Sequence, residues 1–220
     1  MKILVIAPHA DDEILGCGGV ISRYISEGNE VKVLVITRAL EELFPKPLMD
    51  QIREEAVKSH QFLGVSETIF FDFPAPMLDQ TPSYQISMEI SKVIKEFSAE
   101  KVFLPHRGDI HKDHRAVFEA ALVALRPIND CPVKEIYAYE TLSETEWAPP
   151  FGDDAFIPNV FVDITDYMEN KKEAMLCFES QVKEFPHSRS IECIESLAKF
   201  RGATIGKKAA EAFMLIRKIV

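Results

Sequence analysis

The chain has few cysteines, no cluster of basic residues and no long hydrophobic run, and each absence excludes a class of protein. Its four cysteines, Cys17, Cys131, Cys177 and Cys193, form no CxxC pair, so we expect reduced thiols and neither a CxxC zinc or redox motif nor a disulfide framework. The net charge is −10 and no basic run exceeds two residues, which disfavours binding to nucleic acid or to an anionic lipid surface. No apolar stretch approaches the roughly 20 residues of a membrane helix. Without a signal peptide at the start, the sequence predicts a cytoplasmic protein with no integral membrane segment.

The composition that remains is that of an ordinary globular protein. Hydrophobic residues make up 47% and charged residues 27% of 220 residues, enough to build a large core without disulfides or a structural metal. No Gly/Ser-rich linker, internal repeat or change in composition divides the chain. We therefore expect a single domain spanning residues 1–220.

Apolar runs and helical patterns alternate along the first two thirds of the chain. Strands are expected at residues 3–7, 31–37, 68–73, 101–104 and 135–139, and helices at 13–26, 49–63, 86–97 and 115–125. Further along, the pattern predicts a strand at 160–164, helices at 168–182 and 191–200, and either a final strand or a helix end at 213–219. This order predicts an α/β fold, a Rossmann-like, mostly parallel sheet with helices on both faces.

Two polar clusters follow predicted strands. The segment Pro8-His9-Ala10-Asp11-Asp12-Glu13 comes directly after the first strand, and His111-Lys112-Asp113-His114 comes a few residues after the strand at 101–104. Ligands bind at the carboxyl edge of the strands in open α/β sheets, so the fold itself can bring the two clusters together at that edge.

The residue types of the two clusters form a set of metal ligands. Zinc accepts imidazole nitrogens and carboxylate oxygens, and a catalytic zinc keeps one position open for water. His9 and Asp12 are three residues apart, and His114 could supply the third ligand. The other polar side chains would then be available for proton transfer and orientation: Asp11, His111 and Asp113. The plainer alternative is that the acids merely cap helices.

The two clusters resemble the signatures of a known family. The start KILVIAPHADDEILGCGG and the later HKDH are similar to the PHxDDE-type and HxDH motifs of the PIG-L/LmbE-like zinc-dependent N-acetylglucosamine deacetylases. The resemblance covers most of the chain and includes Arg53 within IREEA and the segment GKKAAEAF near the end. Ala10 stands where the family often has proline, and its side chain is not a ligand.

The resemblance implies a role for each matching residue. His9, Asp12 and His114 correspond to the zinc ligands, and Asp11 corresponds to the general base that acts on a zinc-activated water. Zinc is the implied metal, although iron and cobalt also suit a histidine and carboxylate site.

Three further residues take implied roles in handling the substrate. His111 corresponds to the group that stabilises the oxyanion and can protonate the leaving amine. Asp113 would hold the His111 imidazole in one tautomer and favour its charged form. Arg53 corresponds to an arginine that binds substrate.

The implied activity is hydrolysis of the N-acetyl group of an N-acetylglucosamine-type sugar or glycoconjugate, releasing acetate and a free amine. The expected partner is that substrate, and the sequence leaves a homo-oligomer open. His106, Arg107 and Asp109 precede HKDH and could support the site or line the pocket, or form a plain loop. The role of the segment 139–158 stays open: Tyr139 and Trp147 could stack on a sugar ring or belong to a packed loop.

Three other interpretations compete with deacetylation. The same site could hydrolyse an ester or phosphoester, the chain could be a non-catalytic sugar- or nucleotide-binding module, or it could be a structural subunit with a relic site. A dinucleotide site at Gly16–Gly19 is disfavoured because Ile21 replaces the last glycine of the GxGxxG pattern and the acids at 11–13 would repel a pyrophosphate.

Overall fold

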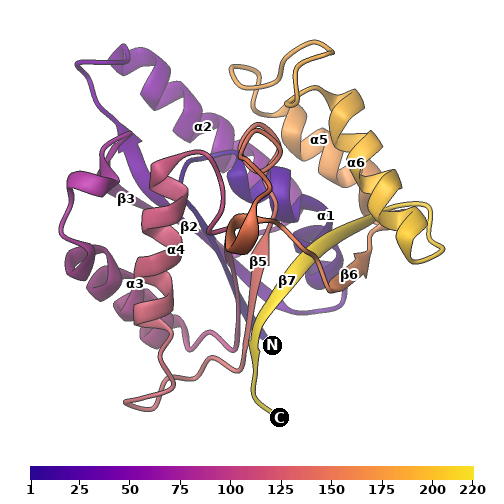
Figure 1. The fold of residues 1–220 in the computed structure, drawn as a ribbon. Helices are drawn as coiled ribbons and strands as arrows, with labels where there is room; N and C mark the ends of the chain where they lie inside the picture. The colour runs from indigo at the N-terminus through magenta and orange to yellow at the C-terminus, as the bar shows by residue number, and fades with distance from the viewer.

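The computed structural model describes residues 1–220 and contains a seven-stranded sheet flanked by helices (Figure 1). The strands are β1 (Lys2–Ala7), β2 (Glu30–Ala39), β3 (Glu67–Ala75), β4 (Lys101–Pro105), β5 (Glu135–Tyr139), β6 (Val160–Asp163) and β7 (Ala210–Lys218). The α-helices are α1 (Asp12–Ser26), α2 (Lys46–Leu63), α3 (Ser83–Phe97), α4 (Lys112–Ala124), α5 (Met168–Leu176) and α6 (Ile191–Thr204). Three short 3₁₀ helices are η1 (Leu78–Gln80), η2 (Gly152–Asp154) and η3 (Thr165–Tyr167).

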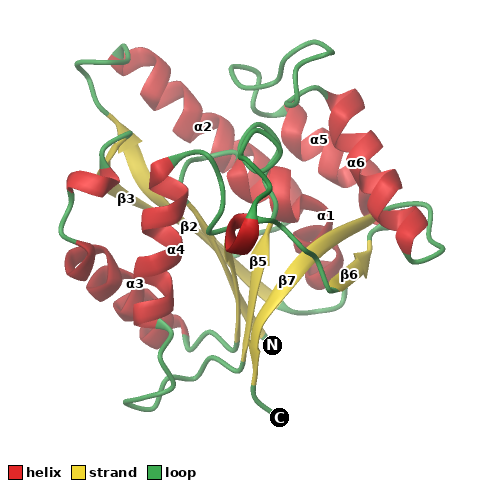
Figure 2. Cartoon of the chain, in the orientation of Figure 1, coloured by secondary structure: helices red, strands yellow, loops and turns green.

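The strand order β3-β2-β1-β4-β5-β7-β6 confirms the predicted fold class. Strands β1 to β5 pair in parallel with their neighbours, whereas β7 runs antiparallel to both β5 and β6. Figure 2 shows this sheet crossing the middle of the molecule between the two layers of helices. The result is a Rossmann-like, mostly parallel sheet with an antiparallel extension at one edge.

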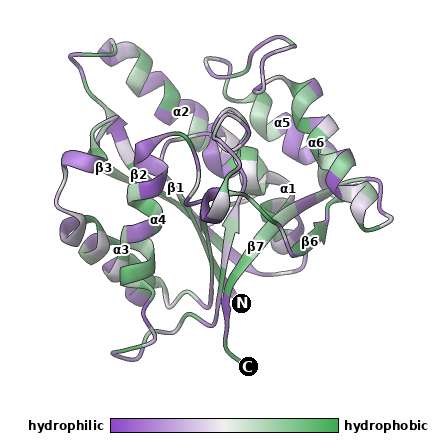
Figure 3. Cartoon of the chain, in the orientation of Figure 1, coloured by the Kyte–Doolittle hydropathy of each residue, from purple (hydrophilic) through white to green (hydrophobic).

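Strand β1 shows why its apolar run is continuous. Ile3 and Val5 belong to the core shared with α1, α2, α5 and α6, while Leu4 and Ile6 belong to the core shared with α3 and α4. Successive side chains of a strand point to opposite faces, so a strand covered on both sides needs apolar residues at every position. The central strands are accordingly coloured as hydrophobic in Figure 3.

Two predictions near the C-terminus are decided by the structure: one helix is shorter than expected, and one undecided segment is a strand. Helix α5 ends at Leu176, so the expected helix at 168–182 is too long. The chain turns away because the Ser180 backbone N–H and hydroxyl both donate to the Glu55 carboxylate on α2, at 3.0 and 2.6 Å. The ambiguous segment 213–219 is a strand, part of β7, which gains its pairing from β5 and β6.

None of the helices is both long and apolar enough to cross a membrane.

Candidate active site

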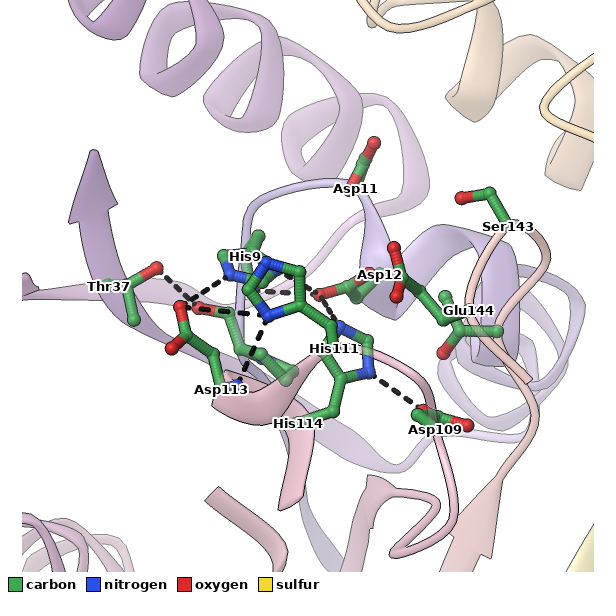
Figure 4. A network of polar contacts seen from close by, with 12 residues as sticks. His9, Asp11, Asp12, Thr37, Asp109, His111, Asp113, His114, Ser143 and Glu144 are labelled. Atoms are coloured by element: carbon green, nitrogen blue, oxygen red, sulfur yellow. Dashed lines mark hydrogen bonds and ion pairs between the residues drawn. The ribbon is translucent and has the colours of Figure 1, made fainter. Parts of the chain in front are cut away.

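The two polar clusters meet at the carboxyl edge of the sheet. Strands β1 and β4 are parallel neighbours, with Val5 paired to Phe103. The loop from β1 to α1 carries His9 and Asp11, and the loop from β4 to α4 carries His111, so adjacent strands deliver both clusters to one place (Figure 4). The juxtaposition expected from the sequence is therefore present.

The backbone at Asp11 adopts a left-handed conformation, with φ at 115°. A residue with a side chain rarely holds this conformation unless its surroundings fix it. Here the Asp11 N–H donates to Glu13 Oε2 at 3.2 Å, and the Thr37 hydroxyl donates to the carbonyl of Pro8 at 2.8 Å. The turn that presents the Asp11 side chain is thus held from both sides.

A buried chain of contacts supports Glu13. Glu13 Oε1 lies 2.9 Å from His60 Nε2, and His60 Nδ1 lies 2.8 Å from the Thr68 hydroxyl. Both His60 and Glu13 are buried, so α2 and β3 position the turn at Asp11. The motif contained Glu13, but nothing in the sequence linked it to His60.

His9, Asp12 and His114 place one ligand atom each within 4.8 Å of one another. Asp12 Oδ2 lies 3.2 Å from His9 Nδ1 and 3.2 Å from His114 Nε2. His114 Nε2 is buried yet makes no hydrogen bond, which leaves its lone pair available to a ligand. A buried nitrogen without a partner is costly in a folded protein, and a metal ion at this point would satisfy it.

A second group, His9, His111 and Asp113, also meets the distance criterion for a metal. It fits less well, because both oxygens of the Asp113 carboxylate are already engaged, whereas the Asp12 carboxylate has contacts only at Oδ2. Its Oδ1 accepts the Leu78 N–H at 3.0 Å, and its Oδ2 lies 3.1 Å from His9 Nε2. The set His9, Asp12 and His114 therefore fits a divalent metal better.

Asp109 orients His114. Its Oδ2 lies 2.7 Å from His114 Nδ1, and its Oδ1 accepts the Thr145 hydroxyl at 2.6 Å. A carboxylate on one nitrogen of a histidine fixes the ring and directs the other nitrogen at the metal. The sequence left Asp109 open between a residue that supports the site and part of a plain loop, and it lies five residues before His114.

The contact expected between Asp113 and His111 differs from the prediction. The Asp113 carboxylate is 3.1 Å from His9 and 3.9 Å from His111 Nδ1. The Asp113 backbone N–H instead donates to His111 Nδ1 at 3.1 Å. Burial, together with the charge on His9, lowers the pKa of His111 to about 4. Asp113 thus fixes the His111 tautomer through its backbone, and the surroundings favour the neutral ring rather than the charged one.

Carboxylates surround the two histidines of the cluster and set their pKa values. Burial opposes charge on His9, but its hydrogen bonds to the Asp113 and Asp12 carboxylates outweigh burial and raise its pKa to about 9. Burial likewise opposes charge on His114, yet Asp12 and Asp109 raise its pKa well above the usual range. The two histidines in turn hold the pKa of Asp12 well below its usual value in spite of burial. Positive charge is therefore stabilised between these side chains.

The pKa of Asp11, the residue expected to act as the base, shifts in the opposite direction to that of Asp12. Burial raises the pKa of Asp11 to about 8, although Arg189 acts against this shift. Asp11 Oδ2 makes no hydrogen bond and lies 3.5 Å from Arg189 Nη1. A carboxylate with a raised pKa and a free oxygen is suited to accept a proton near neutral pH.

A cavity of about 410 Å³ opens beside the cluster. His9, Asp11 and His111 form one part of its wall, and Arg53 is also part of the lining. The Arg53 guanidinium donates to the Phe71 carbonyl at 2.6 Å and to Asp72 at 2.7 Å. Apolar side chains complete much of the lining: Val35, Phe44, Leu48, Met49 and Ile52.

The cavity residues that the sequence did not predict include Glu144, Gln181 and Arg189. They come from the segment after β5 and from the loop between α5 and α6, far from either motif. No local pattern could have found them, because only the folded chain brings them to Asp11.

Tyr139 and Trp147, the aromatic residues that could have stacked on a sugar, do not line the cavity. Tyr139 is fully buried, its hydroxyl donates to the Ile6 carbonyl at 2.9 Å, and its ring lies against Gly16. Trp147 is 53% exposed and contacts His187, with ring centroids 5.8 Å apart.

The fold and the site together define an α/β protein with a candidate metal centre at the carboxyl edge of its parallel strands. Comparison with known families is more specific. The model of the PIG-L family, GlcNAc-PI de-N-acetylase, matches residues 4–125. This chain belongs to the PIG-L family of deacetylases, as its motifs predicted.

Individual relatives agree with the family. The chain is 27% identical to the diacetylchitobiose deacetylase of Thermococcus kodakarensis, over 98% of this chain and 83% of that protein. It is 25% identical to a probable N-acetyl-alpha-D-glucosaminyl L-malate deacetylase 2 of Bacillus anthracis, over 81% of this chain and 80% of that protein.

Solved structures share the fold. The N,N'-diacetylchitobiose deacetylase of Pyrococcus horikoshii superimposes with a TM-score of 0.78 at 24% identity, covering 98% of this chain and 84% of that one. The 4-carboxy-2-hydroxymuconate hydratase GalB of Pseudomonas putida also superimposes, with a TM-score of 0.73 at 20% identity, covering 100% of this chain and 97% of that one. Because one fold supports a deacetylase and a hydratase, the reaction has to be argued from the site.

Proposed function

We propose that this chain is a metal-dependent hydrolase that removes the N-acetyl group from an N-acetylglucosamine-type sugar or glycoconjugate, yielding acetate and a free amine. The observation that carries the proposal is the unpartnered, buried Nε2 of His114. It lies 3.2 Å from Asp12 Oδ2, which in turn lies 3.2 Å from Nδ1 of His9 on the wall of the cavity. The deacetylase names of the relatives support the choice of reaction.

His9, Asp12 and His114 would hold the metal, with zinc as the first candidate and iron or cobalt as alternatives. A divalent ion bound there would make a water molecule more acidic and polarise the carbonyl of the acetamide. Asp109 and Asp113 would keep the two histidine rings in place through 2.7 and 3.1 Å contacts.

Asp11 would act as the general base. Its Oδ2 makes no hydrogen bond and the residue lines the cavity, so it can take a proton from the water that attacks the acetyl carbon. Asp12 cannot replace it, because its Oδ2 faces both histidines. The proton held by Asp11 is then available to the leaving nitrogen when the C–N bond breaks.

His111 would stabilise the oxyanion. Its Nδ1 accepts the Asp113 backbone N–H, so the neutral ring carries its proton on Nε2 and can donate it as a hydrogen bond. Preorganised donors of this kind are worth on the order of 10²–10³ in rate. The proposal therefore uses His111 as a neutral donor, and Arg53, from the same cavity, would bind the substrate.

The test measures metal content and acetate release on the same sample. We expect about one zinc per chain by elemental analysis, acetate release from N-acetylglucosamine or diacetylchitobiose, and loss of both on chelation. Metal without release of acetate from either sugar would argue against this substrate class. A chain that takes up no divalent metal after reconstitution would refute the proposal.

A further inference from the structure

One corner of the cavity is polar but lies outside the proposed metal ligands and base. Glu144 follows β5, while Gln181 and Arg189 lie in the loop between α5 and α6. Figure 4 shows Glu144 reaching toward Asp12 from the segment that also carries Ser143. All three residues line the cavity together with Asp11 and His111.

Glu144 brings an unused acceptor to this corner. Its side chain is 10% exposed, and its Oε2 is buried without any hydrogen-bond partner. Its backbone carbonyl accepts the Ile110 N–H at 3.2 Å, which ties the residue to the loop that carries His111. Burying a carboxylate oxygen without a partner is unfavourable, and a ligand that donates to it would remove this cost.

Arg189 brings unused donors held in a fixed direction. Its Nε donates to the Ser143 hydroxyl at 2.8 Å, and its Nη1 donates to Gln181 Oε1 at 3.0 Å. Its Nη2 makes no hydrogen bond and lies 3.8 Å from Glu144 Oε1. The guanidinium is thus anchored on one side, and its Nη2 remains free on the side of Glu144.

The charges of this corner select a neutral ligand. Two carboxylates, Glu144 and Asp11, and one guanidinium, Arg189, line this corner, so an ion of either sign meets at least one like charge. A hydroxyl group can donate to Glu144 and accept from Arg189 at the same time. A hydrogen bond between a hydroxyl and a charged side chain is stronger than one between two neutral groups.

We propose that Glu144, Arg189 and Gln181 form a subsite that binds hydroxyl groups of the sugar ring and so aligns its acylamino group with Asp11 and His111. This inference rests on the proposed function for the identity of the sugar. It assigns specificity to residues outside both sequence motifs.

The test compares a sugar with a ring that lacks hydroxyl groups. N-Acetylglucosamine and N-cyclohexylacetamide carry the same acetamide on a six-membered ring. For Glu144→Gln and Arg189→Lys we expect kcat/KM on N-acetylglucosamine to fall about 10- to 100-fold, mainly through KM, because a hydrogen bond to a charged group is lost or misaligned. On N-cyclohexylacetamide the same variants should match the unmodified chain within about twofold.

Glu146→Gln is the matched control, since Glu146 is exposed, does not line the cavity, and keeps the oxygen that accepts the Ser143 N–H. It should leave kcat/KM on both substrates unchanged. Equal losses on both substrates for Glu144→Gln would overturn the inference in favour of a general structural effect. No loss on either substrate would also overturn it.

A binding measurement separates this inference from the proposed function. We expect calorimetry to give a Kd for N-acetylglucosamine that rises at least tenfold in Glu144→Gln, with metal content unchanged. If the unmodified chain releases no acetate but its Kd still depends on Glu144, the subsite stands and the deacetylase proposal fails. A Kd that is the same in both proteins overturns the subsite, whatever the activity.

Discussion

At the scale of single residues, the site depends on side chains whose surroundings prepare them for one task. Asp11 is strained in its backbone, with φ at 115°, and free at its carboxylate oxygen Oδ2. Asp12 sits one residue later but faces two histidines. The left-handed turn makes this separation possible, because it sends adjacent carboxylates to different partners.

Replacing Asp11 with asparagine tests the role of the base. Asparagine has nearly the same size and tolerates a positive φ, so the turn should persist. We expect the rate of acetate release to fall by about 10³-fold, within the usual range for loss of a general base, while elemental analysis finds the metal content unchanged. Turnover within tenfold of the unmodified chain would contradict the assignment.

Replacing Asp109 with asparagine tests the orientation of His114. The carboxylate that lies 2.7 Å from His114 Nδ1 would become an amide, and we expect the affinity for zinc to fall about 10- to 100-fold. Competition with a chromogenic chelator measures the affinity. Thr145→Val is the control, because it leaves the contact between Asp109 and His114 in place and removes only the Thr145 hydroxyl, which donates to the other oxygen of Asp109 and accepts the Thr141 N–H. Equal affinities in the asparagine variant and the unmodified chain would remove Asp109 from the site.

At the scale of elements, close packing of α1 against the sheet holds the motif in place. The helix begins at Asp12 and runs over β5, where Gly16 touches the ring of Tyr139. A Cβ on Gly16 would lie 2.2 Å from that ring. The hydrogen bond from Tyr139 to Ile6 fixes the ring, so neither element can move away easily.

We therefore expect Gly16→Ala to lower the free energy of unfolding by about 1–3 kcal/mol, the usual cost of overpacking, in spite of alanine's better helix propensity. Urea denaturation followed by circular dichroism measures the difference. Gly18→Ala is the comparison, since its Cβ would meet side chains of Lys171 and Ile14 at 3.1 and 3.2 Å. A Gly16 variant as stable as the Gly18 variant would show that α1 is not seated as described.

Strand β5 is joined to its neighbours by a charged contact at its first residue. Glu135 lies 3.1 Å from Lys101 on β4 and 3.0 Å from Lys218 on β7. Burial opposes its ionisation, but hydrogen bonds from Lys218, Tyr137 and Lys101 lower its pKa from 4.5 to about 2. A lowered pKa in the folded chain means that this contact stabilises the fold above pH 4.5 and that the contribution disappears as the pH falls toward 2.

Glu135→Gln should thus lower the free energy of unfolding by about 1–2 kcal/mol at pH 7. The difference from the unmodified chain should shrink between pH 4.5 and pH 2, which urea denaturation at several pH values can follow. Glu67→Gln removes an exposed pair with Lys32 and should cost no more than about 0.5 kcal/mol. A difference that does not change with pH would contradict the assigned pKa.

At the scale of the whole molecule, one continuous sheet links the first and last parts of the chain. Strand β7, near the C-terminus, pairs with β5 and β6, and α1 packs against α5. We propose that residues 1–220 act as one domain, which these contacts support. Fluorescence and circular dichroism should then report the same denaturation midpoint.

Metal binding should stabilise this whole unit, because the proposed ligands come from segments about a hundred residues apart and approach one another only in the folded chain. At a free zinc concentration of about 100 times Kd, linkage predicts a gain of about 2.7 kcal/mol and a rise in Tm of roughly 5–10 °C. Calorimetry with and without a chelator measures the shift. His114→Ala should show no such rise, and an equal rise in that variant would place the metal elsewhere.

The sequence by itself determined the order of strands and helices, the fold class and the two motifs, because these depend on local patterns. Buried parallel strands are apolar at every position, and the PHADDE and HKDH segments each lie within a few residues of a strand end. The edge at which ligands bind follows from the parallel arrangement.

Only the tertiary structure decided the rest, because those features depend on contacts between distant segments. Helix α5 ends earlier than predicted because Ser180 donates two hydrogen bonds to the Glu55 carboxylate on α2. The last segment is a strand since β5 and β6 offer it hydrogen-bonding edges. Glu144 and Arg189 reach the cavity from segments without any motif, where no periodicity or spacing along the chain could have predicted their meeting.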